Sequence, residues 1–148
     1  EHLGIIALGL GLGPAGIFAA LFHTLNHSVC KSLSFFAAAR LGQFHESYDM
    51  RQIKGVIHSS PLWGTALLTS LLALIGVAPF AVFISEFLLV KAMIELHSTW
   101  VLILFLTGSG VVFVAALDHL IPMVWGETSL KTIPHRPHLL ETGIVIVS

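Results

Sequence analysis

The sequence has 148 residues, of which 55% are hydrophobic and 10% are charged, and its formal net charge is -1. Soluble domains carry about 25% charged residues, so the composition argues against an ordinary soluble domain. The near-zero net charge gives no indication of nucleic-acid binding. The sequence therefore predicts an integral membrane protein of the all-α class, with the lipid bilayer as its surroundings.

Long uncharged stretches indicate the membrane-spanning segments. Asp, Glu, Lys and Arg are absent from residues 2–30, 55–85 and 96–117. A helix needs about 20 residues to cross the hydrocarbon layer, and each stretch is long enough. We expect a polytopic transmembrane helix bundle with four full spans and two partial spans, one partial span at each end. Residues 1–148 would then form a single transmembrane region within a larger membrane subunit.

In chain order, the predicted elements begin with a partial span at residues 3–12 and a turn at residues 11–14, where Gly and Pro act as helix breakers. The polar residues 40–60 are expected to hold a short interfacial helix that ends near Gly55. A polar loop is expected at residues 126–138, before the second partial span. The four full spans are predicted at residues 15–39, 62–75, 80–96 and 99–125.

The segment GVAPF at residues 76–80 interrupts an otherwise continuous apolar run. We predict that one helix is broken here, near Pro79. Two interpretations of the break are open: a tight outer loop between two spans, or an interruption at membrane depth. Non-helical backbone at that depth is tolerated only where protein or a water-filled cavity covers it.

Three ionisable side chains, His23, His27 and Lys31, lie four residues apart inside the first full span. Residues four apart share one face of a helix, so the groups form a line about 12 Å long at 1.5 Å per residue. A charged residue at the bilayer centre costs roughly 2.5–3.5 kcal/mol, and such groups often mark proton or ion routes. The row predicts a proton relay. The alternative is a structural role, in which polar side chains hydrogen-bond between helices.

Glu86 is a further relay candidate, because it lies within a predicted span seven residues after Pro79. An ionisable group beside a helix break is typical of transporter ion sites. The alternative is a salt bridge to Lys91, but a separation of five residues is poor helical spacing. Lys91 is instead expected to extend toward the membrane surface. Asp118 and His119, near the end of the last full span, form either a proton exit or a solvated helix end.

No metal site and no cofactor site is predicted. The pair His23 and His27 has a spacing that could hold zinc, but no Glu or Cys completes a ligand set. Cys30 alone cannot hold an iron–sulfur cluster, and GLGLGP lacks the Lys and Ser/Thr that follow in a phosphate-binding loop. The chain is therefore expected to carry no redox equipment and no catalytic residues of its own.

Several motifs, in their order and spacing, resemble the proton-translocating antiporter-like membrane subunits. That family includes the large membrane subunits of respiratory complex I, of hydrogenase-4 and formate hydrogenlyase, and of multisubunit cation/proton antiporters. The pattern His, His, Lys followed by Phe is most similar to the hydrogenase-4 subunits, and EHLGIIALGLG resembles the end of their S-S-I-E-H-M-G segment. The motifs are HTLNHSVCKSLSFFAAA, DMRQIKGV and SPLWGTALLTSLLALIGVAPFAVFISEFLLV.

The resemblance implies a full subunit of about fourteen helices with inverted repeats. This chain would match a C-terminal fragment, from the end of the ninth helix to the start of the fourteenth. His23, His27 and Lys31 match the central proton-relay helix, and Glu86 matches the ionisable residue on the broken twelfth helix, near the proton outlet. Ala78 replaces a Pro of the usual Gly-x-Pro-Pro-Phe turn. The helices with the Glu/Lys input pair would lie upstream.

The function that the resemblance implies is proton translocation across a bacterial or archaeal inner (cell) membrane. The chain would be a non-redox part of a hydrogenase-4-like or NADH:quinone oxidoreductase-like complex. Its partners would be other membrane subunits and a peripheral redox arm that performs the electron chemistry. The alternatives are a cation/proton antiporter subunit without a redox partner, and an inert membrane segment whose polar groups only hold helices together.

Overall fold

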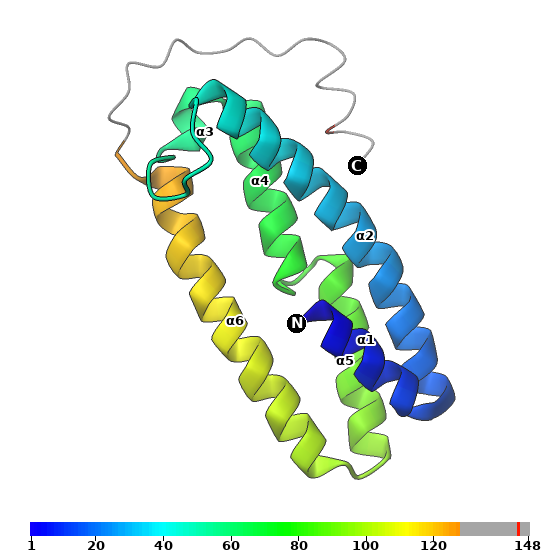
Figure 1. The fold of residues 1–148 in the computed structure, drawn as a ribbon. Coiled ribbons are helices and arrows are strands. Elements are labelled where there is room, and N and C mark those ends of the chain that lie inside the picture. Colours follow the sequence, from blue (N-terminus) through cyan, green and yellow to red (C-terminus); the bar gives the residue numbers. More distant parts are fainter. Residues whose placement is uncertain (128–144, 146–148) are drawn as a thin grey trace. The chain divides into compact units, whose positions relative to one another are not determined.

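The computed structural model describes residues 1–127 and residue 145 (Figure 1). Every regular element within residues 1–127 is a helix, which confirms the predicted all-α class. The predicted polar loop is described only to residue 127, and the second partial span lies outside the described residues apart from residue 145. The helices of this part of the chain are α1 (His2–Gly11), α2 (Gly13–Phe44), α3 (Val56–Ser59), α4 (Pro61–Leu74), α5 (Ala81–Glu95) and α6 (Thr99–Trp125).

The chain forms two compact units. The first unit contains residues 1–29 and 72–116. The second contains residues 30–71 and, among the described residues, 117–127. The helices α2, α4 and α6 therefore each contribute residues to both units.

Helix boundaries mostly follow the breakers in the sequence. The glycine–proline turn at residues 11–14 separates α1 from α2, as predicted. Pro61 begins α4, where its missing N–H removes no helical hydrogen bond. α2 continues beyond its predicted end to Phe44, because Arg40 stacks 5.1 Å from the Phe44 ring centroid and donates a 2.9 Å hydrogen bond to Gln43. These contacts join the last two turns of the helix.

The short helix in the polar stretch begins where the sequence predicted that it would end. Gly55 precedes α3 and has a φ of +64°, a left-handed conformation that favours glycine. Residues 45–55 instead form a folded loop, in which the Asp49 carbonyl accepts the backbone N–H of Gln52 at 3.0 Å and of Ile53 at 3.2 Å. The predicted interfacial helix before Gly55 is therefore wrong.

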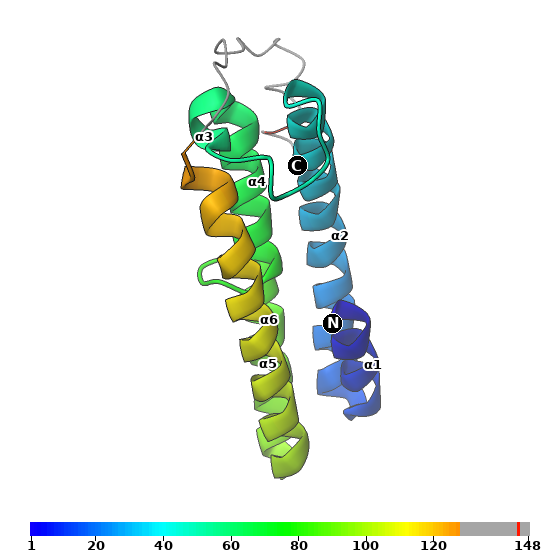
Figure 2. The same ribbon diagram turned by 60° about the vertical axis from the view of Figure 1, so that its left-hand side comes forward.

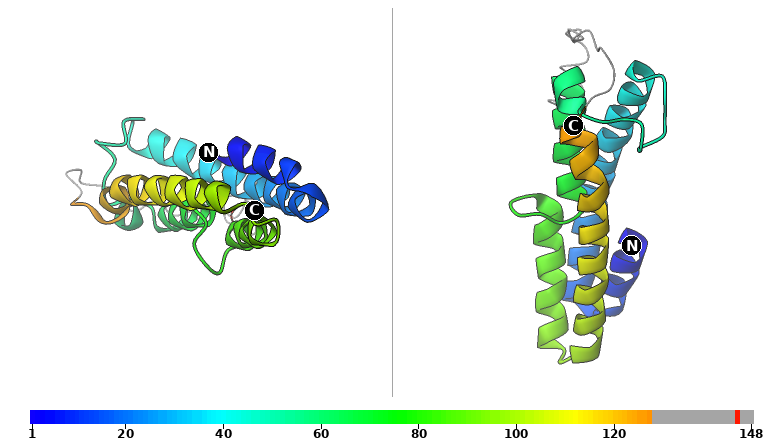
Figure 3. Two further views of the ribbon diagram at one scale, coloured as in Figure 1. Left: turned by 90° about the horizontal axis from the view of Figure 1, so that it is seen from below. Right: turned by 90° about the vertical axis from the view of Figure 1, so that its left-hand side faces the viewer.

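The first unit packs α1 and the beginning of α2 with α5 and the first part of α6. α1 folds back along α2 (Figure 2), and α5 runs antiparallel to the start of α6 (Figure 3). The close approach of α1 and α2 depends on a small residue, because a Cβ on Gly9 would lie 2.8 Å from the Cβ of Ala20. Such small-residue packing stabilises helix pairs in lipid, where water exclusion contributes little. The buried core of the unit is Ile5, Ala19, Leu89 and Met93.

α6 is the most apolar long helix of the described structure. It has 27 residues and a mean hydropathy of 2.4 over its most apolar stretch, none of which is buried. Large side chains such as Leu104, which is 72% exposed, cover its surface and would need lipid or partner helices as neighbours. Among the described helices, α6 alone is both long and apolar enough to cross a membrane, while α1 and α4 are apolar but shorter. The predicted number of four full spans is thus not confirmed.

The helical pattern is interrupted at residues 75–80, between α4 and α5, where the break was predicted. The backbone N–H groups of this segment donate mainly to carbonyls at the end of α4. The Gly76 N–H donates to the Ala73 carbonyl at 3.3 Å, and the Val77 N–H donates to the Leu72 carbonyl at 3.1 Å. Gly76 has a φ of +72°, which is the left-handed cap that commonly ends a helix. The segment therefore meets much of the hydrogen-bonding demand of non-helical backbone in an apolar setting.

Candidate functional site

A chain of hydrogen bonds joins three helices of the first unit through His23. The His23 side chain is fully buried. Its Nε2 atom lies 3.1 Å from Nδ1 of His2 on α1, and its Nδ1 atom lies 2.8 Å from Oγ of Ser85 on α5. These three residues are called the His2–His23–Ser85 chain below. It ties α2, which carries the predicted relay residues, to α5, which carries Glu86.

When both imidazoles are neutral, the hydrogen bonds of the His2–His23–Ser85 chain can run in one direction only. The Ser85 hydroxyl donates its only hydrogen to the Val82 carbonyl at 2.6 Å, so its oxygen accepts from Nδ1–H of His23. The Nε2 atom of His23 then carries a lone pair and accepts from Nδ1–H of His2. An imidazole that accepts at one nitrogen and donates at the other can bind a proton on one side and release one on the other. His23 thus has one accepting and one donating ring nitrogen, each bonded to a side chain of another helix.

His27 lies one turn further along α2 and packs beside the same imidazoles. Its ring centroid is 4.2 Å from that of His2 and 6.2 Å from that of His23, with the rings of His23 and His27 only 8° from parallel. Two of these histidines were predicted as relay residues. His2 was missed, because nothing in the periodicity of the sequence indicates that α1 folds back onto α2.

We predict that Ser85→Ala destabilises the protein by about 1–3 kcal/mol, because it leaves Nδ1 of the buried His23 without its acceptor. Ser70→Ala is the matched control. Ser70 is also buried within a helix, but its hydroxyl donates to a carbonyl of its own helix, that of Leu67, at 3.0 Å. The control should cost no more than about 1 kcal/mol. Denaturant-induced unfolding of the complete protein in mixed micelles compares the two variants, and equal losses would contradict the assigned His23–Ser85 bond.

Glu86 follows Ser85 on α5, and its carboxylate rests against the helix break. A Cβ on Gly76 would lie 3.0 Å from the carboxyl carbon of Glu86 and nearer still to Oε2. The Glu86 carboxylate therefore occupies the space that a side chain at position 76 would need, and glycine leaves that space empty. The Glu86 side chain also lines a pocket of about 390 Å³, together with Ser109 and Gly110 of α6.

Lys91 does not pair with Glu86 as the structural alternative proposed. Its Nζ atom lies 3.8 Å from Oε1 of Glu95, one turn along α5, and the two side chains are 64% and 58% exposed. An exposed pair of this kind contributes only about 0–1 kcal/mol. The Glu86 carboxylate is thus set apart from the exposed ion pair of its own helix.

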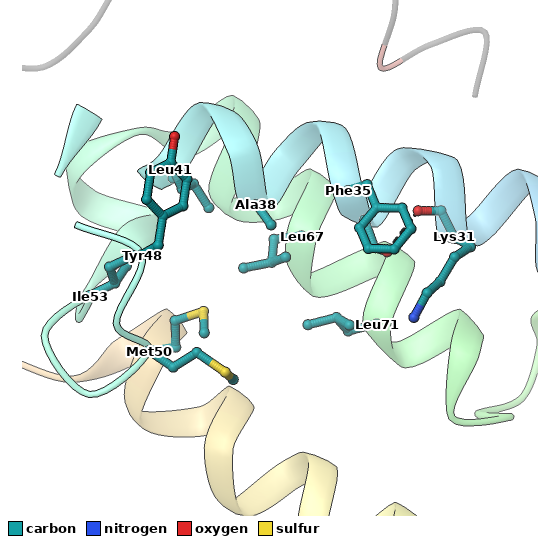
Figure 4. Close-up of a pocket in the computed structure, with 11 residues that line it drawn as sticks. Lys31, Phe35, Ala38, Leu41, Tyr48, Met50, Ile53, Leu67 and Leu71 are labelled. Carbon is teal, nitrogen blue, oxygen red and sulfur yellow. Dashed lines mark hydrogen bonds between the residues drawn. The ribbon is translucent and has the colours of Figure 1, made fainter. Parts of the chain in front are cut away.

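Lys31 belongs to the second unit, where it lines a mainly apolar pocket of about 260 Å³ (Figure 4). Its Nζ atom lies 5.1 Å from the centroid of the Phe35 ring, which is a cation–π distance. Ser34 donates a 2.9 Å hydrogen bond to the Lys31 backbone carbonyl. The other lining residues are Ala38, Leu41, Tyr48, Met50, Ile53, Leu67, Leu71 and Met123.

Two further groups of ionisable side chains lie nearer the helix ends. Asp118 and His119 are exposed on α6, about two turns before it ends, which fits both a proton exit and a solvated helix end.

His45 follows α2 and is buried, with Nε2 at 3.1 Å from Oγ of Ser59 and Nδ1 without a partner among the described residues. Burial lowers the pKa of His45, so the neutral imidazole is favoured there. No described group of three or more His, Cys, Asp or Glu side chains is arranged to hold a metal ion.

The described structure thus combines an exposed apolar helix, α6, with a buried imidazole, that of His23, which bonds to side chains of two other helices. The chain belongs to the NADH:quinone oxidoreductase/Mrp antiporter transmembrane family, whose sequence profile matches residues 1–112. Members of this family are subunits of multisubunit membrane complexes. This confirms the resemblance seen in the sequence motifs.

Three relatives represent different branches of the family. The chain is 38% identical over 93 residues to "Hydrogenase-4 component F homolog" of Methylacidiphilum infernorum (isolate V4), covering 62% of this chain and 20% of that protein. It is 36% identical over 93 residues to "NADH-quinone oxidoreductase subunit L" of Mycobacterium tuberculosis (strain H37Rv), covering 62% and 15%. It is 29% identical over 152 aligned positions to "Putative antiporter subunit mnhD2" of Staphylococcus aureus (strain JH9), covering 98% and 30%. The chain thus spans less than a third of the length of each of these proteins.

Proposed function

We propose that this chain moves protons across the membrane, as part of an antiporter-like subunit of a redox-driven complex of the hydrogenase-4 or NADH:quinone oxidoreductase kind. The observation that carries the proposal is the His2–His23–Ser85 chain, which holds a buried imidazole in a donor–acceptor arrangement between helices. Ionisable groups inside membrane helices commonly form proton relays. The 38% identity to a hydrogenase-4 component F homolog supports the redox-driven kind.

Each relay residue has its own role in this proposal. His23 and His27 pass a proton along α2, with His2 as an additional carrier. Lys31, one turn beyond His27, holds the proton as an ammonium. Glu86 receives and releases it beside the helix break. Coupling is electrostatic, because the loss or gain of one charge changes the proton affinity of neighbouring ionisable groups.

The membrane arrangement in this proposal has α2, α4, α5 and α6 as full spans, with α1 and the end of the chain as partial spans. The segment 75–80 lies at membrane depth, which its backbone hydrogen bonds to the end of α4 and its contact with Glu86 support. Asp118 and His119 form the proton exit. Residues 1–148 are one transmembrane region of a larger subunit and match its C-terminal part. The partners are other membrane subunits and a peripheral redox arm, in a bacterial or archaeal inner membrane.

A second candidate function is cation/proton antiport without a redox partner. One specific observation favours it: the similarity to the Staphylococcus aureus antiporter subunit extends over 98% of this chain. The relay residues would serve the same purpose in both functions. The two functions differ in what drives the protons, which is electron transfer in one and a counter-gradient of Na⁺ or K⁺ in the other.

Inside-out membrane vesicles that contain the complete native complex separate these functions. With a redox-driven complex, addition of an electron donor acidifies the vesicle interior, and the acidification does not require Na⁺ or K⁺. With an antiporter, Na⁺ or K⁺ pulses collapse an imposed pH gradient and electron donors have no effect that depends on this chain. If deletion of the chain's gene changes neither response while the other subunits assemble, the chain does not carry the protons and the proposal is wrong.

A further inference from the structure

We propose that the loop of residues 45–55 is the gate through which Lys31 exchanges protons with the aqueous phase, and that Tyr48, seated on Gly42, is the residue that closes it. The inference rests on the proposed role of Lys31 as a proton carrier. It adds the route by which water reaches that carrier, and it concerns only the second unit.

The 45–55 loop has two chemically different sides. Tyr48, Met50 and Ile53 line the apolar pocket that contains Lys31, and Figure 4 shows Lys31 and Tyr48 toward opposite ends of that pocket. Other side chains of the same loop line a polar pocket of about 540 Å³. The residues of the polar pocket are His45, Glu46, Ser47, Arg51, Gln52, Lys54 and Glu127. The loop therefore has an apolar side that faces the pocket of Lys31 and a charged side that lines the polar pocket.

The loop is held in a defined shape by Asp49. The Asp49 carboxylate accepts the backbone N–H of Arg51 at 2.9 Å and the Gln52 side-chain amide at 3.3 Å. The Asp49 N–H donates to Oγ of Ser47 at 3.2 Å. A loop with this many internal hydrogen bonds can move as one piece. The apolar side chains of the loop would then keep facing the Lys31 pocket, and its polar side chains the polar pocket, while the loop moves.

The Tyr48 side chain rests on Gly42 and is largely exposed. Its ring lies against Gly42 of α2, where a Cβ would come within 3.1 Å of the ring carbon Cζ and closer to two other ring carbons. The side chain as a whole is 74% exposed. The missing side chain at position 42 thus leaves room for the ring against α2, and the exposure of the rest of the side chain leaves it space to move. A small displacement of Tyr48 would open the end of the pocket toward the polar residues.

An opening of this kind is needed if Lys31 is to act as a carrier. Most of the lining around Lys31 is apolar, so it offers water few hydrogen-bond partners. A proton moves between an ammonium and bulk solvent only through water or another titratable group. The polar pocket supplies such titratable groups, because His45, Glu46 and Glu127 line it.

Thiol labelling in the full-length subunit, in native membrane vesicles, tests the gate without any transport assay. In a Cys30→Ser background, Lys31→Cys provides a reporter at the amine position. The probe is a membrane-impermeant methanethiosulfonate, added to one face at a time. We expect slow labelling in this parent and labelling at least about tenfold faster with Tyr48→Ala, because a closed gate leaves the open state populated to 10% or less. The increase should occur only from the face that carries the 45–55 loop.

Two further variants complete the test. Tyr48→Phe keeps the ring and should label like the parent. Gly42→Ala displaces the ring and should label like Tyr48→Ala, which provides a second result if Tyr48→Ala fails to assemble. Equal labelling rates in all variants, or faster labelling only from the opposite face, would overturn the gate. Proton transport by the Lys31→Met variant tests the relay separately. Normal transport by that variant together with gated labelling would contradict the relay alone, and lost transport together with ungated labelling would contradict the gate alone.

Discussion

Replacing Lys31 by Met in the full-length protein is expected to lower proton transport about 100-fold while the complex still assembles. Without the amine, a proton must pass this position as an uncompensated charge in apolar surroundings, which costs roughly 2.5–3.5 kcal/mol. Each 1.4 kcal/mol added to a barrier is a factor of about ten in rate. The methionine side chain is apolar and unbranched like the lysine stem, so the pocket between Phe35 and Met123 should stay filled.

The measurement is the initial rate of pH change in vesicles, normalised to the amount of assembled complex. Lys91→Met is the matched control, because it removes the same amine from a side chain that is 64% exposed and paired with Glu95. That variant should transport protons at nearly the parental rate. If Lys31→Met also transports normally, Lys31 is not a proton carrier.

Glu86→Gln is expected to have an effect of similar size, a loss of about 100-fold or more in proton transport. Loss of a positioned acid–base group typically costs 10²–10⁴-fold. Glutamine has the shape of glutamate, so it can occupy the space over Gly76 and beside Ser109. Its amide, however, does not bind or release a proton near neutral pH. The substitution therefore tests the chemistry of the carboxyl group rather than its packing.

Glu95→Gln on the same helix is the control for Glu86→Gln. Glu95 is 58% exposed and pairs with Lys91 at the surface, so its replacement should leave transport unchanged. Both variants are compared in the same vesicle assay at several pH values. Similar losses in the two variants would indicate a general dependence on negative charge along α5, and would contradict a specific role for Glu86.

Much of the helical pattern could be predicted from local chemistry. Uncharged stretches and breakers such as Pro61 set the positions of the helices, because both act within a few residues of themselves. The row of His23, His27 and Lys31 could be predicted for the same reason, since helical periodicity alone aligns residues four apart. Where a helix ends at another residue than predicted, as α2 does, side-chain contacts between neighbouring turns determine where it ends.

The residues that complete the site could not be predicted in this way. His2 and Ser85 reach His23 from positions 21 and 62 residues away in the sequence, and no local pattern encodes such tertiary neighbours. Gly76 could be recognised as a helix breaker, but not as the surface on which the Glu86 carboxylate rests. The 45–55 loop was expected to contain a helix, whereas Asp49 folds it into turns and the helix starts only after Gly55.

The most direct test of the relay is infrared difference spectroscopy of the complete complex, recorded between the resting and the proton-translocating state. We expect a change in the stretching band of a protonated carboxyl group that is absent in Glu86→Gln and retained in Glu95→Gln. A spectrum in which the band assigned to Glu86 stays constant through turnover, while protons are still translocated, would contradict proton transfer through this helix.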